Sequence, residues 1–298
     1  MTFRGPRSCR ATRRNDANGS LSTGRGGSRR LCATIGANPS RRQWAQKLSL
    51  KSSIPDFLQV STNICRGRTF LSRCLSLSSN LPIKDVLEIG TGLGTHAQLL
   101  SPSCKSFTGI DLTETASALT AQRLRLFGLP GRALRMDAED MQFASNSFDY
   151  IWSWGVIHHS ADTRRILAEM KRVLRSGGKA TVMVYHRAWW SYYLSAVLRG
   201  VVRGQLKRYR NLHEVAQAAT DGAIARYYTP HEWGEVSKGL FDIEAIRIYG
   251  LKAEILPFPA GRSKTLFERF IPDAFGRLVT NHLRLGSFLV ADMRRASS

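Results

Sequence analysis

The sequence predicts an α/β fold over residues 81–298, with a doubly wound sheet of seven mostly parallel strands. From residue 84 to about residue 185, short apolar runs alternate with amphipathic segments of helical period. This alternation is typical of parallel strands that are connected by crossover helices. A glycine-rich turn directly follows the first apolar run, as at the first strand-to-helix turn of such sheets. A hydrophobic content of 43% is sufficient for a buried core.

The first part of this domain is predicted to contain five strands and three helices. The strands are expected over residues 84–89, 106–110, 133–136, 148–153 and 179–185. The helices are expected over residues 93–100, from an N-cap at Thr113 to a stop at Gly128 and Pro130, and over 163–175. Gly177 and Gly178 are expected to separate the last helix from the strand after it.

The last third is less regular. An aromatic helix is expected over residues 188–206, within a helical insertion over 188–225 that covers the site. Thr229 and Pro230 are expected to open a helix over 231–238, because proline is favoured at the first helical position. The last two strands are expected over 241–249 and 287–293, with a Pro- and Phe-rich insertion at 256–285.

The charge is distributed unevenly along the chain. The formal net charge is +22, and residues 1–80 contain 15 Lys and Arg against two acidic residues. This segment is rich in Arg, Ser and Gly, and we expect a low-complexity, disordered extension, because it cannot bury enough apolar surface to fold. Residues 81–298 carry only +9. The global charge is therefore weak evidence for a nucleic-acid or membrane partner.

Three interpretations of residues 1–80 remain open. An Arg- and Ser-rich segment with few acids is typical of a mitochondrial transit peptide. The other two interpretations are a nucleic-acid-binding tail, and residues without function that an upstream start or a frame error has added. Four of the five cysteines lie in this segment, and their spacing matches no zinc pattern, so no metal site is predicted. The cysteine usage favours a reducing compartment, hence the cytoplasm, with the mitochondrion as the alternative if the segment is a transit peptide.

The strongest motif is the loop after the first predicted strand. Gly90, Gly92 and Gly94 follow a strand and open a helix, so the backbone can turn tightly and approach a ligand. The spacing is GxGxG, which differs from the GxGxxG of dinucleotide sites, and Glu88 is unsuited to holding a pyrophosphate. Asp111 ends the next strand, where a carboxylate can accept both hydroxyls of a ribose.

Six motifs in order resemble the class I S-adenosylmethionine-dependent methyltransferases, which have a Rossmann-like fold. They are Leu87–Gly94, Gly109–Asp111, Asp137–Glu139, Ser147–Ile151, Trp154–His159 and Val173–Gly178. The chain is most similar to the type 11 group, which includes the ubiquinone and menaquinone biosynthesis methyltransferases. The resemblance covers about residues 84–187. It implies S-adenosylmethionine as the cofactor.

The resemblance also implies roles for single residues. Glu88 and the loop glycines would hold the methionine end of the cofactor, Asp111 its ribose, and Asp137 with the backbone of Ala138 its adenine. Ser153 would lie beside the sulfonium. The cofactor-binding residues expected are thus Glu88, Gly90, Gly92, Gly94, Asp111, Asp137, Ala138 and Ser153. Asp149, between Phe148 and the strand, is expected to be structural.

Two histidines follow the fourth predicted strand. His158 and His159 are the candidate catalytic residues, because either could remove a proton from the acceptor. The alternative is that both are packed loop residues. Tyr185 and His186, at the end of the fifth strand, are second-rank candidates.

The methyl acceptor is expected to be a small molecule or a lipid-like compound. Residues 152–155 contain no Asn/Asp-Pro-Pro-Tyr motif, which does not favour a nucleic-acid partner. The aromatic segment 188–203, with arginines at intervals, could be a lid, a packed helix or a site of peripheral membrane contact. A basic RNA-associated methyltransferase and a non-catalytic S-adenosylmethionine-binding protein remain the alternatives. The family also predicts capping helices before the first strand, but residues 60–80 do not have the pattern of such helices.

Overall fold

A computed structural model describes residues 84–194, 225–255 and 270–297, and seven single residues between 197 and 266. These residues belong to the second of two compact units, which spans residues 52–298. The predicted extension at 1–80 and most of the insertion at 188–225 lie outside the described residues.

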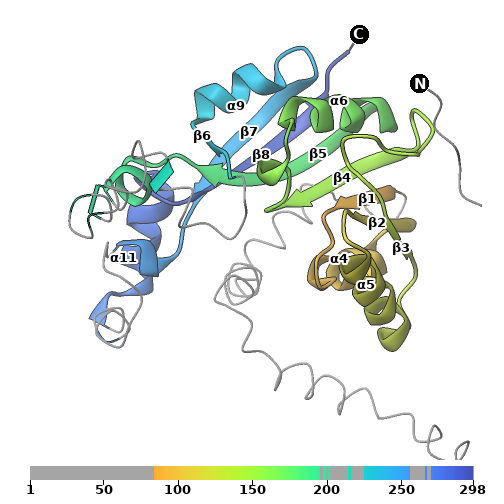
Figure 1. Ribbon diagram of the computed structural model, residues 1–298, viewed down its shortest axis with the longest axis horizontal. Coiled ribbons are helices and arrows are strands. Elements are labelled where there is room, and N and C mark those ends of the chain that lie inside the picture. Colours follow the sequence, from red (N-terminus) through yellow and green to blue (C-terminus); the bar gives the residue numbers. More distant parts are fainter. Residues whose placement is uncertain are drawn as a thin grey trace, which may run out of the picture. The chain divides into compact units, whose positions relative to one another are not determined.

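The described part of the chain forms one sheet (Figure 1), in the order β3-β2-β1-β4-β5-β8-β7. Strand β8 runs antiparallel to both of its neighbours, and the other neighbours along this path pair in parallel. A short eighth strand, β6, pairs with the end of β5. The predicted doubly wound, mostly parallel sheet is confirmed. The strands are β1 (Asp85–Ile89), β2 (Ser106–Asp111), β3 (Arg132–Arg135), β4 (Phe148–Trp154), β5 (Leu174–His186), β6 (Tyr227–Tyr228), β7 (Phe241–Tyr249) and β8 (Phe288–Arg295).

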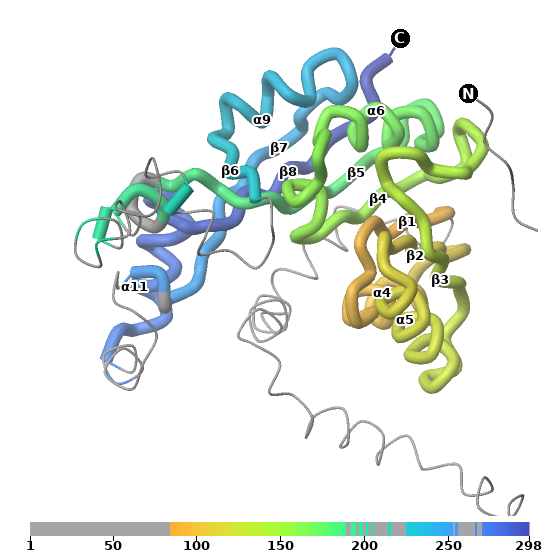
Figure 2. Tube along the Cα trace, in the orientation of Figure 1, coloured from red at the N-terminus to blue at the C-terminus, as the bar shows by residue number. Residues whose placement is uncertain are grey.

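Helices cover both faces of the sheet, as Figures 1 and 2 show. Helices α4 (Thr95–Leu100) and α5 (Glu114–Phe127) pack on one face through Ala97, Leu100 and Leu124. Helices α6 (Thr163–Val173) and α9 (Pro230–Ser237) pack on the other face. The remaining described helical elements are α11 (Asp273–Arg277), the 3₁₀ turns Ser101–Ser103, Ile157–His159 and Lys252–Ile255, and the π-helical segments Trp189–Leu194 and Leu278–His282.

Local sequence determines several helix ends. The Thr113 hydroxyl accepts a hydrogen bond from the backbone N–H of Ala116, and Gly128 ends α5 in the left-handed conformation. At α9, Thr229 and Glu232 form a reciprocal capping box. The predicted boundaries of these two helices are therefore confirmed to within one residue.

Three elements differ from the prediction. The helix expected to reach Arg175 ends at Val173, because Leu174 adopts an extended conformation and pairs with Phe148. Strand β6 was not expected, since two residues are too short to show a strand period. The aromatic helix begins as the π-helical segment Trp189–Leu194.

Asp149 has the structural role that the sequence predicts. Its carboxylate accepts a hydrogen bond from the backbone N–H of Asp85 at 2.8 Å and pairs with Arg175 at 2.6 Å. These contacts join the amino ends of β1 and β4, at the edge of the sheet opposite the glycine loop. Within the described residues, no helix has the length and the hydropathy needed to cross a membrane.

Candidate functional site

The candidate cofactor residues lie along one edge of the sheet. Strand β1 pairs in parallel with β2 on one side and with β4 on the other, and Ile89 is in register with both Ile110 and Ser153. On the far side of β2, Asp111 is in register with Arg135 at the end of β3. The carboxyl ends of four neighbouring strands thus carry the glycine loop, Asp111, Asp137 and Ser153, where ligands of open α/β sheets bind.

The glycine loop turns sharply after β1. The backbone N–H groups of Gly90 and Thr91 both donate to the carbonyl of Ile110, which fixes the loop to β2. Gly90 has a φ of 79°, and a β-carbon placed there would lie 2.1 Å from a methyl group of Val156. Gly92 has a φ of 50° and open space around it. Gly90 is therefore required for packing, whereas Gly92 leaves room for a ligand.

The Asp111 carboxylate connects the loop with α5. One oxygen accepts from the backbone N–H of Gly92 at 3.0 Å, and the other accepts from the N–H and the hydroxyl of Thr113 at 2.9 Å each. The side chain is half-buried beside the open space at Gly92. Its position suits the predicted contact with ribose hydroxyls, which remains a prediction.

Glu88 is buried at the end of β1, with 1% of its surface exposed. Neither carboxylate oxygen forms a hydrogen bond with a described residue. The Nδ1 atom of His96 lies 3.6 Å from Oε1. Burial raises the pKa of this carboxyl, and the neighbouring His96 opposes the shift. A buried carboxylate without hydrogen bonds is costly, and a cationic ligand group would relieve that cost.

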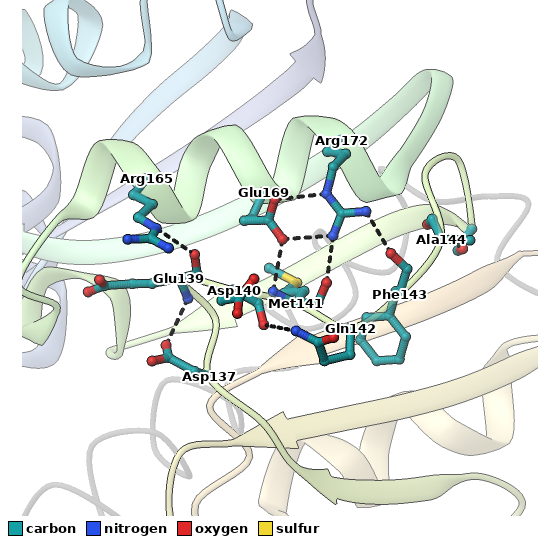
Figure 3. Close-up of polar contacts among 11 residues, drawn as sticks. Asp137, Glu139, Asp140, Met141, Gln142, Phe143, Ala144, Arg165, Glu169 and Arg172 are labelled. Atoms are coloured by element: carbon teal, nitrogen blue, oxygen red, sulfur yellow. Dashed lines mark hydrogen bonds and ion pairs between the residues drawn. The ribbon is translucent and has the colours of Figure 1, made fainter.

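Asp137 and Ala138 begin an acidic loop after β3 (Figure 3). Asp137 accepts a hydrogen bond from the backbone N–H of Glu139 at 2.8 Å, and its side chain is exposed. Ala138 is half-buried and packs against the core beneath α6 and α9. The turn geometry explains Asp137 without a ligand, so its predicted contact with adenine remains a prediction.

Helix α6 holds the acidic loop in place (Figure 3). Glu169 accepts from the backbone N–H of Met141 at 2.8 Å, and Arg172 donates to the carbonyls of Met141 and Phe143 at 2.6 Å each. The two side chains also pair with each other at 2.7 Å. This pairing lowers the pKa of Glu169 and raises the pKa of Arg172. The loop is therefore fixed before any ligand binds.

Two hydroxyls at the same edge are buried without partners. The Oγ atom of Ser153 is on a fully buried side chain, and the Oγ1 atom of Thr91 is on a side chain that is 5% exposed. Neither forms a hydrogen bond in the described part of the chain. Since buried polar groups in folded proteins are nearly always paired, these atoms indicate a place for a polar ligand.

The two candidate catalytic histidines differ in their surroundings. His158 is fully buried, and neither of its ring nitrogens forms a hydrogen bond with a described residue. Its ring packs against those of His159 and Tyr185, with centroids 4.2 Å and 4.0 Å away. Burial, with a smaller contribution from His159, lowers the pKa of His158 well below its ordinary value of 6.5. Burial thus favours the neutral imidazole, which is the form that a general base requires. His159 is half-buried.

A cavity of 440 Å³ borders the loop that carries His158. The backbone N–H of Arg226, which lines the cavity, donates to the carbonyl of His158 at 3.0 Å. Tyr227, another lining residue, packs against Tyr185. The lining residues are Asp162, Thr163, Arg164, Arg226, Tyr227, Tyr228, Glu232 and Val236.

Some residues of the site were missed by sequence reasoning. Thr91 lies within the Leu87–Gly94 motif, but only its burial in the structure marks it as a residue of the site. His96 packs edge-on against Trp152 and Trp154 beneath the glycine loop, and no spacing rule connects these residues. The Glu169 and Arg172 pair is visible as an i, i+3 ion pair, but its contact with the acidic loop is visible only in the structure.

A family model described as a methyltransferase domain matches residues 87–182. These residues form a class I methyltransferase domain. The match begins within β1 and ends within β5, so it contains all the candidate cofactor residues and both His158 and His159, but not Tyr185 and His186. The cofactor of such domains is S-adenosylmethionine.

Curated relatives match the same part of the chain. A phthiotriol/phenolphthiotriol dimycocerosates methyltransferase of Mycobacterium tuberculosis is 34% identical over 137 residues, which cover 45% of this chain and 49% of that protein. A phosphatidylethanolamine N-methyltransferase of Cereibacter sphaeroides is 33% identical over 40% of this chain and 58% of that protein. The chain thus spans about half the length of these relatives.

Solved structures share the fold of the methyltransferase domain at low sequence identity. A putative methyltransferase from Bacillus halodurans has a TM-score of 0.52 and 17% identity, and covers 77% of this chain and 100% of its own. A SAM-dependent methyltransferase from Methanosarcina mazei has a TM-score of 0.51 and 18% identity, covering 74% of this chain and 98% of its own. These matches support the fold alone.

The residues present at the domain's edge fit S-adenosylmethionine. The cofactor carries an ammonium, a carboxylate, a ribose diol and an adenine. The oxygens of buried Glu88 form no hydrogen bond with a described residue, Gly92 leaves space above the loop, and Asp111 offers a carboxylate beside it. These groups therefore agree with the chemistry of the cofactor.

Proposed function

We propose that the chain transfers a methyl group from S-adenosylmethionine to a small or lipid-like acceptor by in-line displacement. One observation carries the proposal. The buried polar atoms that form no hydrogen bond with a described residue include those of Glu88, Thr91, Ser153 and His158, which all lie at the carboxyl ends of β1 and β4. A site that is buried but unsatisfied is prepared for a polar ligand.

The bound cofactor supplies an activated methyl group on a sulfonium. The protein's task is then to align the acceptor with that methyl group and to exclude water. The tight turn at Gly90 follows β1, and the acidic loop held by α6 follows β3. The two loops therefore provide fixed positions on the two sides of β2. Ser153, at the end of β4, lies between these positions and the histidines.

His158 is the general base of this proposal. A hydroxyl or ammonium acceptor must lose a proton, and a neutral imidazole accepts it at a ring nitrogen. The depressed pKa of His158 keeps the imidazole neutral at pH 7, and no hydrogen bond with a described residue occupies its nitrogens. His159, which is half-buried, contacts His158 and is assigned a positioning role.

The relatives support the acceptor class, since their names specify acceptors such as phosphatidylethanolamine and phthiotriol compounds. The cavity beside Arg226 and Tyr227 is our candidate for the entrance of the acceptor.

As part of the same proposal, residues 188–203 make peripheral membrane contact. We place the reaction in the cytoplasm, or in the mitochondrion if residues 1–80 are a transit peptide.

The test is the formation of S-adenosylhomocysteine by the full chain with a panel of acceptors. The panel contains phosphatidylethanolamine vesicles, a long-chain secondary alcohol, sarcosine and RNA. We expect turnover with a lipid or small-molecule acceptor, and loss of turnover in His158→Gln with unchanged cofactor affinity. Turnover with RNA alone, or cofactor binding without any turnover, would contradict the proposal.

A further inference from the structure

Two insertions leave the sheet at the same edge as the glycine loop. Strand β5 is parallel to β1 and β4, and β7 and β5 both run antiparallel to β8. The chain therefore leaves β5 after His186 and β7 after Tyr249 at the carboxyl edge. The backbone N–H of His186 donates to the carbonyl of Ser287 at 2.7 Å, so the first insertion starts where the second one ends. We call residues 187–213 and 250–287 the two basic insertions.

The two basic insertions carry the whole charge excess of the domain. Residues 187–213 contain six basic residues and no acidic residue, and residues 250–287 contain six basic and three acidic residues. The rest of 81–298 contains 17 basic and 17 acidic residues and is neutral. A local excess of this kind attracts an anionic partner.

Most of the large hydrophobic side chains that are exposed in the described part of the chain lie in the same insertions. Twelve large hydrophobic side chains are exposed in the described part of the chain, and eight of them lie in these insertions. In the first insertion, Tyr193, Val197 and Val201 recur at intervals of four residues. In the second, Phe270 is 77% exposed and Phe275 is 50% exposed, and the other three are Leu266, Leu278 and Leu283.

The base of the second insertion is firmly attached to the sheet. The Glu254 carboxylate accepts hydrogen bonds from the N–H and hydroxyl of Ser287 at 2.9 Å each. Gly286 passes so close to Tyr249 that a β-carbon there would lie 2.2 Å from the Tyr249 carbonyl oxygen. The two ends of the insertion are thus held together at the carboxyl edge of the sheet.

We propose that the exposed apolar residues of the β7–β8 insertion, together with those of 187–213, dock on an anionic membrane surface. Aromatic and aliphatic side chains among basic residues, in segments with few acids, are typical of elements that lie in the lipid headgroup region. Nucleic acid would use the positive charge but not the aliphatic side chains. Because both insertions begin at the carboxyl edge, docking would present the acceptor side of the site to the bilayer. In that respect the inference rests on the proposed function.

The test measures partition of the full chain into vesicles of phosphatidylcholine with phosphatidylserine. The variant is Phe270→Ser/Phe275→Ser, and the matched control is Leu99→Ser/Leu119→Ser, which removes exposed apolar side chains from α4 and α5 without changing the charge. We expect about tenfold weaker partition for the variant and no change for the control. The difference should persist at high salt, where the attraction of residues 1–80 is screened.

Three results would overturn the inference. Equal partition of variant and control would show that charge alone binds the vesicles. Dissociation of a dimer by the phenylalanine variant, without an effect on vesicles, would assign the surface to a second copy of the chain. Loss of RNA binding without an effect on vesicles would assign it to nucleic acid. Calorimetry with S-adenosylmethionine separates the two proposals, because a failure of cofactor binding leaves the vesicle result unaffected.

Discussion

The cofactor edge and the two basic insertions depart from ordinary folded structure in opposite ways. At the edge, polar atoms of Glu88, Ser153 and His158 are buried without hydrogen bonds to any residue that the structure describes. In the insertions, apolar side chains such as Phe270 are exposed without packing partners among the described residues. Folding alone favours neither arrangement, since buried polar groups need partners and apolar groups favour the interior. We interpret each departure as a place for a proposed contact, a polar ligand at the edge and a membrane surface at the insertions.

The largest expected effect in this comparison comes from His158→Gln. Loss of a general base reduces turnover by about 10²–10⁴-fold, while a neutral residue of similar polarity leaves the cofactor contacts intact. Single-turnover kinetics measures the rate and calorimetry measures the affinity. His159→Gln is the matched control, with a small effect on the rate. Equal losses in both variants would assign the role to the pair rather than to His158.

The pH profile of the same reaction tests the surroundings of His158. A general base must be deprotonated, and burial lowers the pKa of His158 well below 6.5. Activity should therefore be constant as the pH falls to 6.5 and decline only below it. The acid limb should disappear in His158→Gln. A limb centred at or above 6.5 would contradict a buried, neutral imidazole.

The next effect separates two glycines of one loop. Both Gly90→Ala and Gly92→Ala place a side chain at positive φ, which costs about 1–2 kcal/mol. Only Gly90→Ala also forces a β-carbon against Val156, which adds about 1–3 kcal/mol of overpacking. Thermal unfolding should therefore show a larger stability loss for Gly90→Ala. Equal losses would mean that the loop can shift away from Val156.

A smaller effect is expected from Glu169→Ala. The substitution leaves the Met141 N–H without its acceptor and Arg172 without its carboxylate partner, at a cost of about 1–3 kcal/mol in stability. Because the acidic loop carries Asp137, cofactor affinity should also fall. Arg164→Ala is the control, since this residue of α6 donates to the carbonyls of Val236 and Lys238 and does not contact the loop. A similar loss of affinity in the control would point to general destabilisation of α6.

The sequence predicted the regular half of the domain well because its signals are local. The caps at Thr113 and Thr229 and the glycine loop each depend on a few consecutive residues, and all are found where they were expected. The predicted helix end at Arg175 is wrong, because Gly177 and Gly178 resemble a helix stop in the sequence, whereas pairing with β4 extends β5 back to Leu174.

The sequence predicts at which edge of the sheet the candidate residues lie, but not which distant side chains contact the loops there. The edge that carries Glu88, Asp111 and Ser153 follows from strand order, which motifs can indicate. The buried hydroxyl of Thr91 and the contact of Glu169 with the acidic loop depend on side chains far apart in sequence, so no spacing could reveal them. The exposed face of the β7–β8 insertion was also missed, because a Pro- and Phe-rich segment has no period that distinguishes exposed from buried aromatics.

The most direct test of the central claim is calorimetric titration of the full chain with S-adenosylmethionine, for the unmodified protein, Asp111→Ala and Asp242→Ala. Asp242 is an exposed carboxylate at the start of β7, outside the cofactor edge. If the carboxyl edge binds the cofactor, Asp111→Ala should weaken binding at least about tenfold, because a charge-assisted contact contributes about 1.5–3 kcal/mol. Asp242→Ala should bind as the unmodified protein does. Equal affinity in all three proteins, or no binding by any of them, would contradict the account.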